Sequence, residues 1–165
     1  MFHRLPAPVH RWLLRTAQPV RLRVWGLLRL KVRGASVLAF DPQGRVLLVR
    51  HSYHRPDWWM LPGGGMGRDR DPVRVATREL REETGCRLDG PAWFATHPMP
   101  TAQGWTNVTE LVAGTTADAP RVDGRELREA RFFALDALPE RTCEGPLYYI
   151  GLWQAWMAGQ NGNSA

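Results

Sequence analysis

Cysteine is scarce in this chain, with Cys86 and Cys143 the two thiols among 165 residues. Two cysteines so far apart form neither a disulfide framework nor the spacing of a metal site, so a reducing, cytoplasmic setting is expected. No run approaches the roughly 20 apolar residues of a membrane span. Internal repeats and low-complexity segments are also lacking. A composition that is 44% hydrophobic then predicts one domain with a sizeable core.

Acidic residues are missing from the first 33 positions. Of the 22 Lys and Arg residues, eight lie in this segment, and the other 14 are outnumbered by the 16 Asp and Glu residues. The net charge of +6 therefore comes from a basic, partly helical N-terminal arm at residues 1–33. Its basic residues are Arg4, Arg11, Arg15, Arg21, Arg23, Arg29, Lys31 and Arg33.

The arm allows two interpretations. The segment "APVHRWLLRTA" can form a short basic helix with Val9, Trp12 and Leu13 on one face. Such helices bind anionic surfaces, either RNA or a membrane, which would make the protein peripherally membrane-associated. Alternatively, Trp12 and Leu13 dock on the sheet together with Trp25 and Leu27, and the arginines point to water.

The stretch "LPGGGMGRDRDPVRVATRELREETG" predicts a helix with both ends marked. Asp71 can accept the free amides of a first turn, and Pro72 suits the first helical position. Gly85 can adopt the left-handed conformation that ends a helix. An apolar stripe for burial follows a spacing of three and four, with Val73, Ala76, Thr77 and Leu80.

Three carboxylates share one side of this helix. Glu79, Glu82 and Glu83 stand at i, i+3 and i+4, where they repel one another in water. They could form a solvated face paired with Arg78 and Arg81. The glycine triplet at 63–65 favours a site instead, because its backbone can approach a ligand closely. Oxygen ligands facing a glycine loop suit a magnesium-bound phosphate.

These residues resemble the Nudix box, G-x5-E-x7-R-E-U-x-E-E-x-G-U, where U is aliphatic. Two positions depart from the pattern. Arg70 stands where the family has Glu, and Cys86 replaces the last aliphatic residue, a mild change because a buried cysteine behaves as a small hydrophobe. The matching residues are Gly64, Arg78, Glu79, Leu80, Glu82, Glu83 and Gly85.

The resemblance implies an α/β protein with the Nudix fold, a mixed β-sheet sandwiched between helices (α/β/α). It covers a domain at residues 34–158, followed by a flexible tail at 159–165. A hairpin is expected at 34–51 with its turn at 41–44, and further strands at 59–61, 91–99, 105–115 and 129–140. A closing helix at 146–159 should bury Leu147, Ile150, Trp153, Trp156 and Met157.

The resemblance also implies a reaction, which is Mg²⁺-dependent hydrolysis of a diphosphate linkage in a nucleoside diphosphate derivative, with Mn²⁺ as a substitute. Glu79, Glu82 and Glu83 would be metal ligands and catalytic residues, helped by the Gly63 carbonyl. Arg78 would hold the carboxylates in place by an ion pair.

The general base is open in this scheme. Glu79 itself can serve, or a loop residue can, with Glu126 the first candidate and Glu129 and Glu110 the others. A second functional class is a binding module that Arg70 has impaired as an enzyme and whose arm binds RNA or a membrane. A homodimer is also open.

Substrate contacts are expected from four residues. Arg70 could contact a phosphate. The aromatic residues Tyr53, Trp58 and Trp105 border the family's pocket and could stack on a base. Trp59 is assigned to the core.

Overall fold

The computed structural model describes residue 25 and residues 27–52, 55–122 and 126–162. Tyr53, most of the basic arm and the last three residues of the predicted tail lie outside these described residues. The interpretations that depend on Val9, Trp12 and Leu13 therefore stay predictions.

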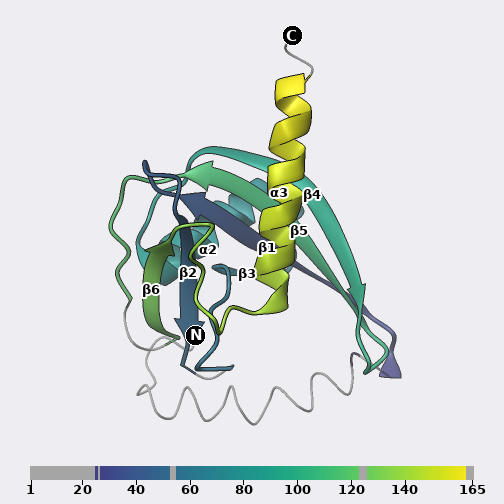
Figure 1. Cartoon of the computed structure of the whole chain (residues 1–165). Helices are drawn as coiled ribbons and strands as arrows, with labels where there is room; N and C mark the ends of the chain where they lie inside the picture. Colours follow the sequence, from purple (N-terminus) through teal and green to yellow (C-terminus); the bar gives the residue numbers. More distant parts are fainter. Residues whose placement is uncertain (1–24, 26, 53–54, 123–125, 163–165) are drawn as a thin grey trace.

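Six strands form one mixed sheet (Figure 1). Their main order is β4-β5-β1-β2-β6, and β3 pairs with β1 beside this path. The β1 and β5 strands run parallel, and the other pairs are antiparallel. The strands are β1 (Lys31–Phe40), β2 (Val46–His51), β3 (Gly63–Gly65), β4 (Asp89–Pro100), β5 (Thr106–Thr115) and β6 (Leu127–Phe133).

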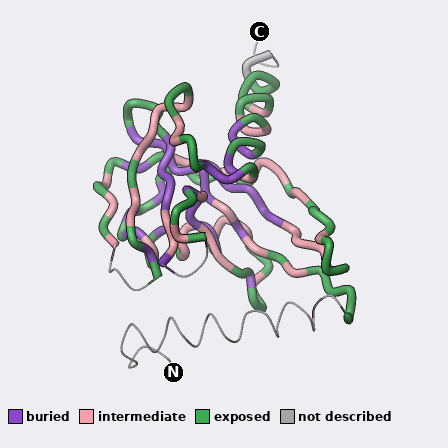
Figure 2. Tube along the Cα trace, turned by 60° about the horizontal axis from the view of Figure 1, so that its bottom comes forward, coloured by how far each residue is buried: buried purple, intermediate pink, exposed green. Residues whose placement is uncertain are grey.

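Two helices cover opposite faces of this sheet, α2 (Pro72–Thr84) and α3 (Glu144–Gly162) (Figure 1). Side chains alternate between the faces along β1. Val37 and Ala39 pack in the cluster beneath α2, whereas Leu38 and Phe40 pack in the cluster beneath α3. The central strands are accordingly buried along most of their length (Figure 2). The predicted α/β/α Nudix fold is confirmed.

The predicted opening hairpin is present, with β1 and β2 joined by a turn around Asp41. The Asp41 carboxylate accepts hydrogen bonds from the backbone N–H groups of Gln43 and Arg45 at 3.0 and 2.8 Å. Strand β1 begins at Lys31, three residues before the expected domain start. Residues 31–33 therefore belong to the sheet, because parallel pairing with β5 continues through them.

The glycine triplet is a strand rather than the expected loop. Gly63, Gly64 and Gly65 pair with β1 at Ser36, Ala35 and Gly34. The strand expected just before them reduces to isolated bridges, Val49 to Met60 and Trp59 to Thr142. The backbone near the box is therefore held by β1 itself.

The predicted stripe of α3 is confirmed in part, since Ile150 is buried and Trp153 packs on Phe40 with ring centroids 4.2 Å apart. Tyr149 and Ile150 are buried, whereas Leu147 is 48% exposed and Met157 37% exposed. Tyr149 faces the sheet, where its hydroxyl lies 3.3 Å from Thr109 Oγ1. The C-terminal half of the helix projects past the sheet, so apolar residues there have less to pack against (Figure 1). No described helix is long and apolar enough to cross a membrane.

Candidate active site

Helix α2 begins and ends where the sequence predicts. The Asp71 carboxylate accepts hydrogen bonds from the backbone N–H groups of Val73 and Arg74 at 3.0 and 3.2 Å. Gly85 closes the helix in the left-handed conformation, with φ of 73°. The buried stripe is shifted from the expected one, and consists of Val75, Ala76, Leu80 and Thr84. This stripe turns the carboxylate side of the helix toward β3.

The backbone of β3 lies directly against the helix carboxylates. A Cβ atom added to Gly64 would lie 2.3 Å from Glu79 Oε2. A Cβ atom added to Gly65 would meet nothing within 4 Å. A side chain at position 64 would therefore displace the Glu79 carboxylate, a contact that the motif match did not reveal.

Glu83 is anchored to the same strand. The backbone N–H of Gly63 donates a hydrogen bond to Glu83 Oε2 at 3.0 Å. The expected contribution of Gly63 was its carbonyl as a metal ligand, which stays a prediction, whereas the N–H bond is what the structure contains. Each of these two glycines therefore contacts one carboxylate: Gly63 is hydrogen-bonded to Glu83, and Gly64 packs against Glu79.

Burial raises the pKa of Glu83 to about 8, against the opposing effect of the Gly63 hydrogen bond. Repulsion from Glu79, Glu126 and Glu82, in that order, contributes to this raised pKa. A group with this pKa holds a proton at neutral pH. Either a proton or a cation relieves the crowding of negative charge around Glu83.

Arg78 pairs with its neighbour in sequence, as predicted. Its Nη2 atom donates to Glu79 Oε1 at 2.6 Å, and the pair draws the Arg78 pKa above its ordinary value. Arg78 therefore orients Glu79, whereas Glu82 is exposed to solvent.

The donor set suits a hard divalent cation, because it consists of carboxylate oxygens close to backbone amides. Across the described residues, however, no three acidic, histidine or cysteine side chains converge into a ready-made metal shell. Glu79 points to Arg78 and Glu83 to Gly63. The ligand chemistry fits a magnesium ion, and these two side chains would turn their oxygens toward it on binding.

The structure separates the three candidates for a loop base. Glu110 is buried and accepts a hydrogen bond from Arg33, and Glu129 is paired with Arg50 and Arg131. Glu126 is exposed, and its charge contributes to the raised pKa of Glu83. Its carbonyl also accepts a hydrogen bond from the Ser52 N–H at 2.8 Å, which fixes it at the end of β2. Of the three candidates, Glu126 is the one whose charge acts on Glu83, so it is the best placed to serve as the base.

The predicted substrate contacts are dispersed. Arg70 is exposed on the loop before α2, and Trp58 is 40% exposed. Trp105 packs edge-to-face on Trp25, with ring centroids 5.5 Å apart, where β5 begins. Ala35, which pairs with Gly64, also pairs with Glu110, and Glu110 lies five residues along the chain from Trp105. Trp105 therefore lies away from the helix carboxylates that contact β3. Trp59 is buried in the core, as expected.

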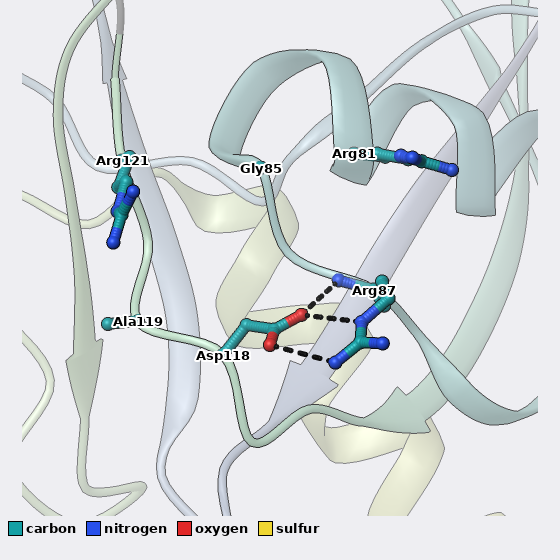
Figure 3. A pocket seen from close by; sticks show the side chains of 6 residues that line it. All are labelled: Arg81, Gly85, Arg87, Asp118, Ala119 and Arg121. Atoms are coloured by element: carbon teal, nitrogen blue, oxygen red, sulfur yellow. Dashed lines mark hydrogen bonds and ion pairs between the residues drawn. The ribbon is translucent and has the colours of Figure 1, made fainter.

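A pocket of about 400 Å³ lies at the C-terminal end of α2 (Figure 3). Its lining includes Arg81, Arg121 and the C-terminal Gly85, with Arg87 bound to Asp118 by side-chain contacts of 3.2 and 3.3 Å. None of the candidate carboxylates lines it. The candidate site is therefore the open surface between α2 and β3 rather than this pocket.

The NUDIX domain family matches residues 30–150, and the chain belongs to this family. Among curated proteins, it is 32% identical over 130 residues to isopentenyl-diphosphate Delta-isomerase of Streptomyces griseus, covering 69% of this chain and 62% of that protein. It is 37% identical over 65 residues to RNA pyrophosphohydrolase of Bartonella henselae, covering 33% and 36%. The chain spans less than two thirds of the length of these relatives.

Solved structures support the fold. The MutT NUDIX hydrolase of Burkholderia pseudomallei matches with a TM-score of 0.66 and 24% identity, over 74% of this chain and 97% of that one. At this level of identity, the match concerns the fold alone.

Substituting the two neighbouring glycines tests the contact with Glu79. In Gly64→Ala the new methyl group displaces the carboxylate, a movable side-chain end, so the fold should survive. Catalytic rate should fall about 10²-fold, as a misplacement near 1 Å can cause. Gly65→Ala should keep the wild-type rate, because its methyl group meets open space. Equal steady-state rates for the two variants would contradict the proposed role of the contact.

Glu83→Gln tests the anchored carboxyl group. The amide keeps the volume and can still accept the Gly63 hydrogen bond, but it cannot supply a negative ligand. The rate should fall by ~10³ or more, as expected for one member of a catalytic unit. The metal-free free energy of unfolding should stay equal or rise, because a crowded buried carboxyl group is gone. A rate within tenfold of wild type would remove Glu83 from the site.

Proposed function

We propose that this protein is a Mg²⁺-dependent pyrophosphohydrolase that cleaves a diphosphate linkage in a nucleoside diphosphate derivative. The observation that carries the proposal is the seating of Glu79 and Glu83 against the glycine strand. Family membership and the name of the RNA pyrophosphohydrolase relative support it.

The roles follow from the contacts. Glu79, Glu82 and Glu83 would hold the cation, with the Gly63 carbonyl as a further ligand. When bound, Mg²⁺ neutralises phosphate charge and acidifies water, with Mn²⁺ able to substitute. Glu126 takes the proton of the attacking water, whose oxygen bonds to phosphorus as the bridging P–O bond breaks and a phosphate group leaves. Arg78 keeps Glu79 oriented throughout.

Arg70 changes the electrostatics at the start of the box. A cation in place of the family's Glu removes one attraction toward each divalent ion and adds one repulsion. Over about 8 Å, one such unit interaction amounts to roughly 0.5 to 2 kcal/mol for effective dielectric constants between 80 and 20. The helix carboxylates would therefore hold one cation, any further cation would depend on the substrate's own phosphates, and Arg70 would be free to contact a substrate phosphate.

Turnover of a substrate panel tests the proposed reaction. Sugar nucleotides, dinucleoside polyphosphates, nucleoside triphosphates and 5′-capped RNA are incubated with Mg²⁺ or Mn²⁺, and released phosphate and nucleotide are measured. Isopentenyl diphosphate belongs in the panel because of the isomerase relative. A double-bond shift with the diphosphate intact would replace the hydrolase with an isomerase. Binding without turnover would favour the alternative of an RNA- or membrane-binding module.

Paired Gln substitutions identify the base. Glu126→Gln should lower the rate about 10²-fold or more, as loss of a general base does. Glu129→Gln, three residues along the chain, should keep the rate because Arg50 and Arg131 occupy that carboxylate. If both variants react at the wild-type rate, Glu79 becomes the candidate base.

Arg70→Glu restores the family residue. The Mg²⁺ concentration for half-maximal rate should fall about tenfold, the change that 1.4 kcal/mol produces. The Michaelis constant should rise if Arg70 contacts phosphate. Arg68→Glu is the matched control, since it makes the same charge change at another exposed position two residues away. An identical magnesium dependence in wild type and Arg70→Glu would show that this residue has no effect on the metal.

A further inference from the structure

A second group of polar side chains lies on the α2 face of the sheet, outside the Nudix box. Its centre is Glu110 on β5, which is 1% exposed. Three side chains donate hydrogen bonds to its carboxylate: Arg33 Nη2 at 2.5 Å, Thr96 Oγ1 at 2.7 Å and Trp93 Nε1 at 3.0 Å. Burial alone would raise the Glu110 pKa, but these hydrogen bonds, with that of Arg33 foremost, hold it below its ordinary value.

Strand register places this group beside the candidate active site. Ala35 on β1 pairs with Gly64 on one side and with Glu110 on the other. Paired residues project to the same face of a sheet, and Ala35 belongs to the cluster beneath α2. Glu110 therefore faces the same side as Glu79. Two strand spacings separate Gly64 from Glu110, or about 10 Å.

The outer members of the group are open to solvent although its centre is buried. The Trp93 side chain is anchored by its ring nitrogen, yet the residue is 54% exposed. Arg33 has a side chain that is 48% exposed, and only its Nη2 is engaged with Glu110. The remaining guanidinium N–H groups are available to a ligand. An oriented indole and an oriented cation are thus presented together.

A single exposed tryptophan on a protein surface needs no functional explanation. Trp93 could serve only to cover the buried Glu110 carboxylate. Two features go beyond that covering role. The anchoring hydrogen bond fixes the ring at little further entropic cost on binding, and the guanidinium beside it suits an anion. Aromatic faces bind nucleobases by stacking, whichever the base.

We propose that Trp93 and Arg33, oriented by Glu110, form the nucleoside subsite of this enzyme, with the base stacked on Trp93 and its 5′-phosphate bound by Arg33. The subsite deepens the proposed function, on which it rests, by assigning the nucleoside end of the substrate to Trp93 and Arg33. The ribose links the base to this 5′-phosphate, which is the first phosphate of the diphosphate that extends toward Glu79 and Glu83. Recognition by stacking predicts tolerance among the four bases.

Product binding tests the subsite without any need for turnover. Calorimetric titration compares the four nucleoside 5′-monophosphates with ribose 5-phosphate, all in Mg²⁺. Wild type should bind each nucleotide at least tenfold more tightly than the sugar phosphate, within the range of stacking on one aromatic ring. Equal affinities for nucleotide and sugar phosphate in wild type would overturn the proposal, with no variant required.

Substitutions then localise the effect. Trp93→Leu should remove the preference for nucleotides while leaving ribose 5-phosphate affinity unchanged, and Trp93→Phe should keep most of the preference. Tyr148→Leu is the matched control, since Tyr148 is 52% exposed but lies on α3 across the sheet. A nucleotide preference retained in Trp93→Leu would overturn the assignment.

The phosphate contact needs a paired change, because removing Arg33 alone leaves a buried charge. Replacing both members, Arg33→Gln with Glu110→Gln, removes the two charges together and keeps an acceptor for Trp93 and Thr96. This variant should lose at least fivefold of the preference for nucleotide over nucleoside. An unchanged preference would exclude Arg33 from the subsite.

The substrate panel tests the hydrolase activity and the titrations test the nucleoside subsite, so one proposal can fail while the other holds. If wild type turns over no substrate but shows the Trp93-dependent preference, the hydrolase is wrong and the subsite holds. If wild type hydrolyses nucleotides while Trp93→Leu binds them normally, the hydrolase holds and the subsite is wrong.

Discussion

The close approach of helix α2 to strand β3 is the constraint on which the candidate site depends. Glu79 packs on the bare backbone of Gly64, and Glu83 accepts the N–H of Gly63. A side chain at position 64 would displace the Glu79 carboxylate from this surface. Pairing of β3 with β1 holds the glycine backbone in the sheet, so the carboxylates contact a strand rather than a loop.

This approach creates an unfavourable concentration of negative charge. Glu83 is largely buried, and the surrounding glutamates raise its pKa further. Arg78 offsets part of the charge at Glu79. A cation bound with a phosphate substrate would offset the remainder, which is a physical reason for expecting metal and diphosphate to bind together. Arg70 is exposed on the loop before α2, and its proposed role is to make cation binding depend more on the substrate.

Several expectations changed once the strands were assembled. The predicted stripe of α3 was confirmed only in part, and Met157 is exposed where the helix runs past the sheet, because burial of apolar residues depends on what lies opposite them. Glu110 was a candidate base by sequence, yet its position between Arg33, Trp93 and Thr96 makes it an anchor. Trp105 was a candidate for stacking, and the structure pairs it with Trp25 instead.

Local signals in the sequence determined the α2 helix, its caps and the family. Asp71, Pro72 and Gly85 act through their own backbone neighbours, and the spacing of Glu79, Glu82 and Glu83 is a property of any helix. The tertiary structure alone decided what these carboxylates face and which distant residues join them. Residues 33, 93, 96 and 110 come together through strand register, and register depends on long-range pairing that no local pattern encodes.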